Sequence, residues 1–234
     1  MSDISTILNT KNDKDEESWI SISDMMTGLM MIFLFIAIIY IQEIRMTFGE
    51  LDAVRERICS QLETEFSEDK KNWKMSICEG GLLVKFNNDG FFLADSPELT
   101  EEFKTLLTDF YPRFKKILWK HIDSIEELRI EGHASSEAKG LSKLDAYIYN
   151  TELSQGRSFN VMNFVLGLNE INRRSDFLSW SYNNLTAHGM SSSELIISSD
   201  GIEDSKASRR VEFRIRAKAE ETLLDLIKEE FNEA

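Results

Sequence analysis

The sequence predicts an α+β protein with one N-terminal transmembrane helix, an amphipathic linker helix and an α/β two-layer domain. Three observations lead to this prediction. Between Glu17 and Glu43 the only charged residue is Asp24, although 29% of the chain is charged. Apolar residues then recur every three or four positions as far as residue 66. From Trp73 onward, short strand-like runs alternate with helical patterns, which is typical of a mixed α/β domain.

The composition limits the classes of function. The chain of 234 residues has a formal net charge of −14 and 42% hydrophobic residues. This hydrophobic share is enough for a folded core. Non-specific nucleic-acid binding needs clustered Lys and Arg, so no direct nucleic-acid contact is expected. The sequence has no P-loop, GxSxG or HExxH motif, and its histidines are scattered. We therefore expect no enzymatic activity, metal or cofactor.

Residues 19–42 are expected to form an uncleaved transmembrane helix after an N-terminal tail at residues 1–18. The apolar stretch exceeds the roughly 20 residues needed to cross the hydrocarbon core. Trp19 and Tyr40 lie near its ends, where interfacial aromatics are common. A cleaved signal peptide would need a basic start and a small-residue cleavage site, and this chain has an acidic start. The basic residues on the two flanks do not decide the orientation.

Asp24 is the most informative residue of this stretch. An ionised Asp at the centre of a span costs roughly 2.5–3.5 kcal/mol, so such a residue usually faces a protein interior or a wet cavity. At helical spacing, Ser21, Asp24, Thr27, Gly28 and Met31 share one small and polar face that another helix can approach closely. Asp24 and Thr27 are therefore candidates for ion translocation. The alternative places Asp24 at the level of the lipid headgroups.

A linker helix is expected over residues 43–72, because apolar residues recur there at helical spacing. These residues are Ile44, Phe48, Leu51, Val54, Ile58 and Leu62. The apolar face either pairs with a second copy of the chain or packs on its own domain. The two cysteines, Cys59 and Cys78, form no Cys/His cluster, so a zinc site is not expected. They are either bridged or free, depending on the compartment.

The domain expected at residues 73–217 begins with a β-hairpin. Its strand-like runs at 74–78 and 82–87 flank Gly80 and Gly81. A helix at 99–118 and a strand at 125–131 follow. The remaining elements are a loop with some helix at 134–150, a helix at 153–166, strands at 185–188 and 211–215, a Ser-rich loop at 191–208 between those strands, and a charged, mostly solvated tail helix within 218–234.

Two stretches resemble known families. The run from Trp19 through Asp24-Met25-Met26-Thr27-Gly28-Leu29-Met30 to Phe33 resembles the span of MotB-type stator subunits, in which the aspartate carries the ion. Four further motifs occur in the order of the OmpA-like peptidoglycan-binding domain. They are Gly132-His133, Tyr149-Asn150-Thr151-Glu152-Leu153-Ser154-Gln155-Gly156-Arg157, Ala187-His188-Gly189 and Arg209-Arg210-Val211-Glu212.

The resemblance implies an inner-membrane protein with a cytoplasmic N-terminus and a periplasmic C-terminal domain. It implies a homodimer whose spans lie inside a ring of a MotA-like membrane subunit, which is a pentamer in that family. Peptidoglycan binding is expected at Tyr149, Asn150, Leu153 and Arg157. The expected transported ion is H⁺, with Na⁺ as the second choice. An oxidising periplasm favours a bridge between Cys59 and Cys78.

The sequence departs from the OmpA-like pattern at one position. The family usually has Gly-His-Thr-Asp, where the Asp helps to hold the diaminopimelate of the peptide stem. This chain has Ala134 and Ser135 instead, while Arg157 is retained. Wall binding is therefore expected to survive in a weaker or altered form. Within the family, the short acidic start and the Met-rich run favour a Zorya-type anti-phage motor, acting indirectly on cytoplasmic effectors. A flagellar stator and a passive wall tether remain the alternatives.

Overall fold

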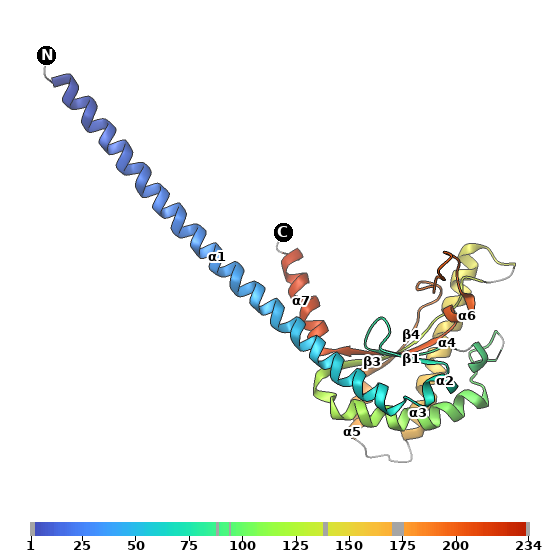
Figure 1. The fold of residues 1–234 in the computed structure, drawn as a ribbon. Coiled ribbons are helices and arrows are strands. Elements are labelled where there is room, and N and C mark those ends of the chain that lie inside the picture. The colour runs from blue at the N-terminus through green and yellow to red at the C-terminus, as the bar shows by residue number, and fades with distance from the viewer. Residues whose placement is uncertain (1–2, 88, 94, 138–139, 170–175, 233–234) are drawn as a thin grey trace. The chain divides into compact units, whose positions relative to one another are not determined.

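The computed structural model describes the chain except residues 1–2, 88, 94, 138–139, 170–175 and 233–234 (Figure 1). The chain divides into two compact units, Met1–Gly49 and Glu50–Ala234. The first helix, α1 (Asp3–Glu65), begins in the first unit and ends in the second.

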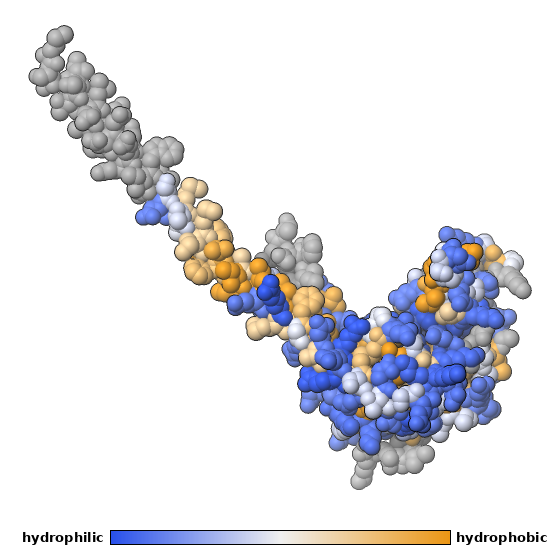
Figure 2. Space-filling view, viewed as in Figure 1, coloured by the Kyte–Doolittle hydropathy of each residue, from blue (hydrophilic) through white to orange (hydrophobic). Residues whose placement is uncertain are grey.

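The first unit contains a helical segment suited to a membrane. Within the described part of the chain, one helix is long and apolar enough to cross a bilayer, and its candidate region begins at Ser23. The large apolar side chains from Met25 to Ile39 are exposed, and Figure 2 shows this apolar surface along α1. Such complete exposure suits a helix whose surroundings are lipid or partner helices rather than water.

The second unit is built around one five-stranded sheet in the order β1-β2-β5-β3-β4. Strands β3 and β4 pair in parallel, and the other neighbours pair antiparallel. The strands are β1 (Met75–Ile77), β2 (Leu83–Phe86), β3 (Ile125–Gly132), β4 (Leu185–Gly189) and β5 (Val211–Ala217). The helices are α2 (Asp69–Asn72), α3 (Glu101–Lys120), α4 (Lys143–Asn169), α5 (Asp176–Asn184), α6 (Ser205–Ser208) and α7 (Lys218–Asn232), with short 3₁₀ turns at Asp89–Phe91 and Ile122–Ser124.

The sheet has one apolar face and one charged face, because side chains alternate along a strand. In β5, Phe213 lies fully buried on the apolar face, next to Val84 of β2. Glu212 and Arg214 lie on the opposite, charged face. The apolar face is covered by helices, and Phe110 of α3 has its ring centroid 5.3 Å from that of Phe213. This arrangement confirms the expected α/β two-layer domain.

Helix α3 shows how the local sequence produces this layer. The Thr100 hydroxyl caps its N-terminus by accepting a hydrogen bond from the Phe103 N–H. Apolar residues then recur at helical spacing, so that one face of the helix is buried. The buried residues are Phe103, Leu106, Leu107, Phe110, Tyr111, Phe114, Ile117 and Leu118.

The segment expected as a linker helix contributes to the same core. Val54, Ile58, Leu62 and Phe66 are buried together with the residues of the sheet and of α3. Of the two expected arrangements for this apolar face, the structure shows packing on its own domain. The tail helix α7, expected to be mostly solvated, buries Leu223 as well.

Helix α4 begins earlier than expected, at Lys143 instead of Leu153. The Ser142 hydroxyl accepts a hydrogen bond from the Asp145 N–H and so supports the first turn. The buried side of α4 contains the small or polar residues Ala146, Asn150 and Ser154. These residues give no apolar periodicity, and the segment therefore looks like a loop in the sequence. Helix α5 was not expected from the sequence.

Candidate functional site

Two glycines allow α4 to approach the sheet closely. Gly132 and Gly189 are paired neighbours at the ends of β3 and β4. A Cβ atom on Gly189 would lie 2.5 Å from the backbone nitrogen of Gln155, and one on Gly132 would collide with the Ser154 carbonyl oxygen. The Gln155 side chain also accepts a hydrogen bond from the Gly189 N–H at 2.7 Å. Helix α4 is therefore fixed over the strand ends.

This position of α4 brings Asn150, one of the four candidate wall-binding residues, beside the segment after β3. Asn150 is buried, and its side-chain amide donates to the Ser135 carbonyl oxygen at 3.0 Å. Tyr149 is exposed and Leu153 is half-buried. Asn150 is therefore held at Ser135, the position that differs from the family pattern.

Arg157 is held by the segment before α3. Its Nε donates to the Ser96 carbonyl oxygen at 3.1 Å, and its guanidinium lies 4.9 Å from the centre of the Phe92 ring. Because this hydrogen bond uses Nε, the two terminal nitrogens of the guanidinium are the ones suited to a ligand. Burial lowers the pKa of Arg157, and the nearby positive charge of Arg209 adds to this effect. Both effects favour an anionic partner.

Arg209 is a second cation at this site. Its Nη1 donates to the Ser135 hydroxyl at 3.2 Å and lies 3.7 Å from a carboxylate oxygen of Glu137. The serine therefore orients an arginine at the position where the family has a carboxylate. The site combines two guanidinium groups, which suits recognition of a carboxylate.

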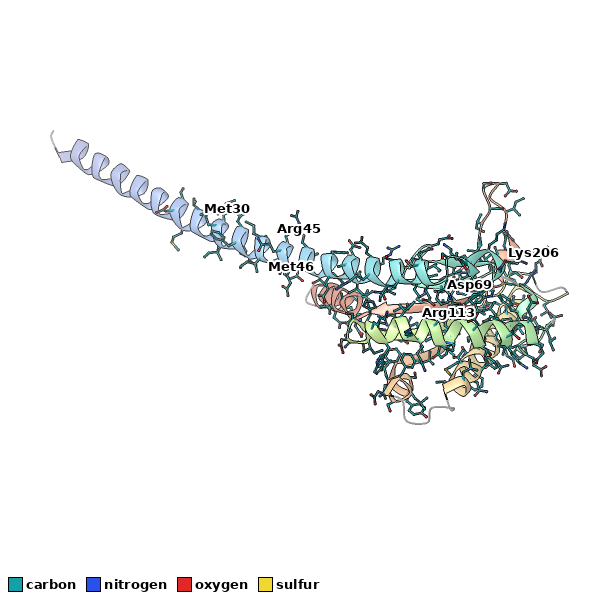
Figure 3. All side chains as sticks on the ribbon, turned by 60° about the horizontal axis from the view of Figure 1, so that its bottom comes forward. Met30, Arg45, Met46, Asp69, Arg113 and Lys206 are labelled. Atoms are coloured by element: carbon teal, nitrogen blue, oxygen red, sulfur yellow. A yellow bond between two sulfur atoms is a disulfide. The ribbon has the colours of Figure 1, made fainter. Side chains whose placement is uncertain are left out.

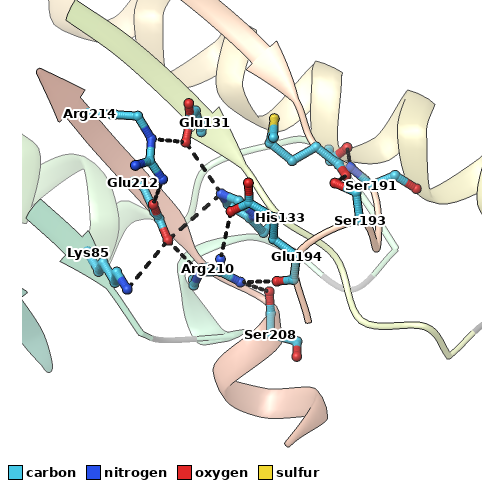
Figure 4. A network of polar contacts seen from close by, with 12 residues as sticks. Lys85, Glu131, His133, Ser191, Ser193, Glu194, Ser208, Arg210, Glu212 and Arg214 are labelled. Carbon is cyan, nitrogen blue, oxygen red and sulfur yellow. Dashed lines mark hydrogen bonds and ion pairs between the residues drawn. The ribbon is translucent and has the colours of Figure 1, made fainter. Parts of the chain in front are cut away.

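A network of buried charged side chains lies on the charged face of the sheet (Figure 4). Arg214 donates to Glu131 and Glu212 at 2.8 Å, and Arg210 donates to Glu212 at 2.6 Å. Arg210 also donates to the backbone carbonyls of Ser208 and Glu194. Arg210 thus joins the loop before α6, at Glu194, to the last residue of α6, and Arg209 is the chain neighbour of Arg210.

His133 lies inside the network, between the two glutamates. Its Nε2 is 3.8 Å from Glu131 and 3.9 Å from Glu212. Burial opposes the ionised form of Glu131, but the contact with His133 and the ion pair with Arg214 outweigh it and lower the pKa. The two carboxylates and the imidazole ring lie close enough together to hold a metal ion. However, Arg210, Arg214 and Lys85 already balance the two carboxylates, so a buried dication would meet net repulsion. The arrangement fits a structural role better.

Asp24 and Thr27 lie together on the first unit. Both side chains are exposed, and the Thr27 hydroxyl donates to the Ser23 carbonyl oxygen of its own helix. Gly28 has open space where a Cβ would lie. The side chain of Ser21, on the same expected face, lies outside the described side chains. The small face around Asp24 is therefore open to a neighbouring helix.

Cys59 and Cys78 form a disulfide within the chain, with their Cα atoms 6.0 Å apart. The sequence did not single out Arg209, Phe92 or Ser96 as parts of the wall-site surroundings. A signal existed for Ser96, because Asp95-Ser96-Pro97 is typical of a turn. The family motif includes Arg209, but the sequence does not show that its side chain points toward Ser135.

The structure combines a long, exposed apolar helix with a sheet domain that has the fold of MotB-like proteins. The chain shares its fold with a putative MotB like protein from Desulfovibrio vulgaris, with 18% identity, a TM-score of 0.50, and coverage of 74% of this chain and 96% of that one. It is also similar to the cell wall anchor of the T6SS from Pseudomonas aeruginosa, with 22% identity, a TM-score of 0.44, and coverage of 67% and 97%.

No protein-family model matches the sequence. A full-length relative is more informative. The Zorya protein ZorB of Escherichia coli is 36% identical over 228 residues, which cover 94% of this chain and 96% of the relative. The chain therefore belongs to the family of the Zorya protein ZorB.

Proposed function

We propose that this chain is the stator-type subunit of a proton-driven rotary motor in a Zorya-like anti-phage defence system. In this role it holds the motor to peptidoglycan and carries protons on Asp24. The observation that carries the proposal is the similarity to ZorB over 94% of the chain. This share is too large to leave out either the apolar helix or the sheet domain.

The proton step requires a carboxylate that changes charge inside the membrane. Asp24 takes a proton from the periplasmic side, becomes neutral and releases the proton toward the cytoplasm. Two copies of the chain place their spans inside a ring of a MotA-like subunit, and alternate contact of their Asp24 faces turns the ring. A membrane potential supplies about 2.3 kcal/mol per charge per 100 mV, which is a usable step. Thr27 is proposed to hydrogen-bond in the same channel, and Na⁺ is the second choice of ion.

The disulfide supports the proposed orientation. Bridges persist in oxidising compartments, so the bond between Cys59 and Cys78 supports a periplasmic sheet domain and a cytoplasmic N-terminus. In that compartment the domain meets peptidoglycan. Arg157 grips a carboxylate of the peptide stem, with Tyr149, Asn150 and Leu153 around it. Because Ser135 replaces the family's acidic residue, an ammonium group of the stem is bound less strongly than in other members.

Two alternatives have distinct signatures. If the chain is a flagellar stator subunit, its deletion would abolish swimming and leave phage resistance unchanged. A passive wall tether would tolerate the loss of the ionisable group at Asp24. Signalling of phage invasion to cytoplasmic effectors belongs to the proposal and depends on the rest of the operon.

The first experiment compares phage protection by the whole operon carrying Asp24 or Asp24→Asn. Asp52→Asn is the matched control, because Asp52 is exposed on the same helix beyond the span. We expect Asp24→Asn to reach the membrane at normal levels and to lose protection, while Asp52→Asn protects normally. Full protection by Asp24→Asn would exclude proton carriage by this residue and favour the passive tether.

A further inference from the structure

The last part of α1 belongs to the sheet domain and is fixed there at several points. Ile58, Leu62 and Phe66 have no exposed surface, and they pack in the main core. The Gln61 side chain contacts the His121 ring at 2.9 Å, at the far end of α3. These contacts exclude a loosely attached linker in this part of the chain.

Arg113 of α3 clamps the C-terminal end of α1 (Figure 3). It donates to both the side chain and the backbone carbonyl of Glu65, at 2.8 and 2.7 Å, and to Asp69 at 2.9 Å. Its guanidinium also lies 4.6 Å from the centre of the Phe66 ring. A cation is favourable at a helix C-terminus because the last carbonyl groups carry partial negative charge. One side chain therefore joins α3 to residues 65–69 through four contacts, while its ion pair to Asp109 at 3.6 Å lies within α3.

The disulfide joins the same segment of α1 to the sheet. Cys59 lies on α1, and Cys78 directly follows β1, where its N–H donates to the Leu83 carbonyl oxygen at 2.8 Å. The bridge therefore enters the hairpin between β1 and β2.

The chain path shows why such fixed points matter. After α1 the backbone passes through α2 into β1, which has three residues and lies at the edge of the sheet. A short edge strand is held by pairing on one side alone. A pull along α1 that followed the backbone would reach this strand first and peel it from β2. The bridge joins α1 to Cys78, which follows β1, and Arg113 joins the end of α1 directly to α3. Neither connection runs through β1.

We propose that Arg113 and the Cys59–Cys78 bridge form a lock that passes force from the membrane-spanning helix into the sheet domain without loading β1. This inference rests on the proposed function, because force arises only if the span works against a wall-bound domain. Arg113 acts as a positioning residue in this lock and does not touch the wall ligand.

The test uses the full-length chain in cells carrying the whole operon. The variants are Arg113→Gln, Cys59→Ser with Cys78→Ser, and the triple combination. Lys104→Gln is the matched control, because Lys104 forms an exposed ion pair with Glu101 on the same helix. Three quantities are measured: phage protection, binding of the detergent-solubilised chain to purified sacculi, and hydrogen exchange of the β1 amides.

We expect each lock variant to reduce protection less than tenfold and the triple variant to reduce it at least 100-fold. Sacculus binding should stay within twofold of the wild type, and the β1 amides should exchange at least tenfold faster in the triple variant. Arg113→Lys keeps the charge but loses the forked geometry, so its effect should be smaller than that of Arg113→Gln. Lys104→Gln should behave as the wild type.

Two results would overturn the lock. One is full protection by the triple variant. The other is a loss of sacculus binding in parallel with the loss of protection, because the contacts would then serve the stability of the domain. If the triple variant does not accumulate, Arg113→Gln with the bridge intact decides by the same comparison. A wild-type chain that does not bind sacculi would instead overturn the proposed function itself.

Discussion

At the scale of single residues, the closest packing in the domain depends on glycine. Gly132 and Gly189 lie side by side, and both face the backbone of α4 where a Cβ would collide. These positions explain why both strands end in glycine. They set the height of α4 above the sheet and hence the position of Asn150 and Arg157.

Gly132→Ala should destabilise the protein by about 2 kcal/mol, because the methyl group forces α4 away from the strands. Gly167→Ala is the control, because Gly167 lies on α4 with nothing within 4 Å of a Cβ. There the better helix propensity of Ala should leave stability equal or slightly higher. Urea unfolding monitored by circular dichroism measures both changes. Equal stability of the Gly132 variant would show that α4 can shift without cost.

Arg157→Ala should weaken binding to purified sacculi by about 10- to 100-fold, because a hydrogen bond to a charged group contributes about 1.5–3 kcal/mol. Arg129→Ala is the control, since Arg129 pairs with Glu127 on the charged sheet face. Sacculus co-sedimentation over a range of protein concentrations gives the two affinities. Unchanged binding by the Arg157 variant would mean that this arginine serves the fold alone.

At the scale of elements, the charged face of the sheet couples strands β2, β3 and β5. Glu131 and Glu212 are directly paired across β3 and β5, so two buried carboxylates lie next to each other. Such a pair is tolerable only because Arg210 and Arg214 donate to it. The sequence does not reveal this charge pairing, because Arg214 and Glu131 are 83 residues apart in the chain.

The network predicts acid sensitivity with a definite sign. Because the pKa of Glu131 is lowered on folding, its stabilising effect is complete above its ordinary pKa of about 4.5 and is lost as the pH falls through the folded value. The free energy of unfolding should therefore decrease below about pH 4.5. Glu131→Gln should cost about 3 kcal/mol at pH 7 and show a shallower decrease at low pH.

Urea unfolding between pH 3 and 7 tests this expectation, with Glu152→Gln on the exposed side of α4 as the control. An equal pH slope for the wild type and Glu131→Gln would show that the acid sensitivity lies in other carboxylates. Glu127, whose pKa is also lowered despite its burial, is the next candidate.

At the scale of the whole molecule, the disulfide joins the last part of α1 to the end of β1 within the second unit. Its two cysteines are 19 residues apart, and a bridge that closes a loop of this size stabilises a protein by about 3 kcal/mol. The same connection joins the sheet to the last part of α1, whose residues Val54, Ile58 and Leu62 pack in the domain core. Stability and attachment of the helix are therefore linked through one bond.

Reduction with dithiothreitol should lower the free energy of unfolding by about 3 kcal/mol. The variant with Cys59→Ser and Cys78→Ser should show the lower stability at once and should not respond to the reductant. Both are measured by urea unfolding with and without dithiothreitol. A wild-type chain that is equally stable in both conditions would show that core packing alone holds α1 in place.

The sequence by itself determined the apolar span, the hairpin of β1 and β2, and α3. Each of these follows from periodicity or turn chemistry within some twenty neighbouring residues, and such patterns are readable without knowledge of the fold. The family motifs likewise indicated Arg157 and the closing strand β5, because their residues are consecutive in the chain.

Tertiary structure decided the features that join distant residues. Helix α4 begins at Lys143, where the Ser142 hydroxyl supports the first turn, and further along the helix Ser154 fits over a strand that ends in glycine, which no apolar pattern records. Arg209 reaches Ser135 across 74 positions, and Arg113 reaches Glu65 across 48. The physical reason is that burial and charge pairing reward proximity in space, whereas a sequence pattern reports proximity along the chain alone.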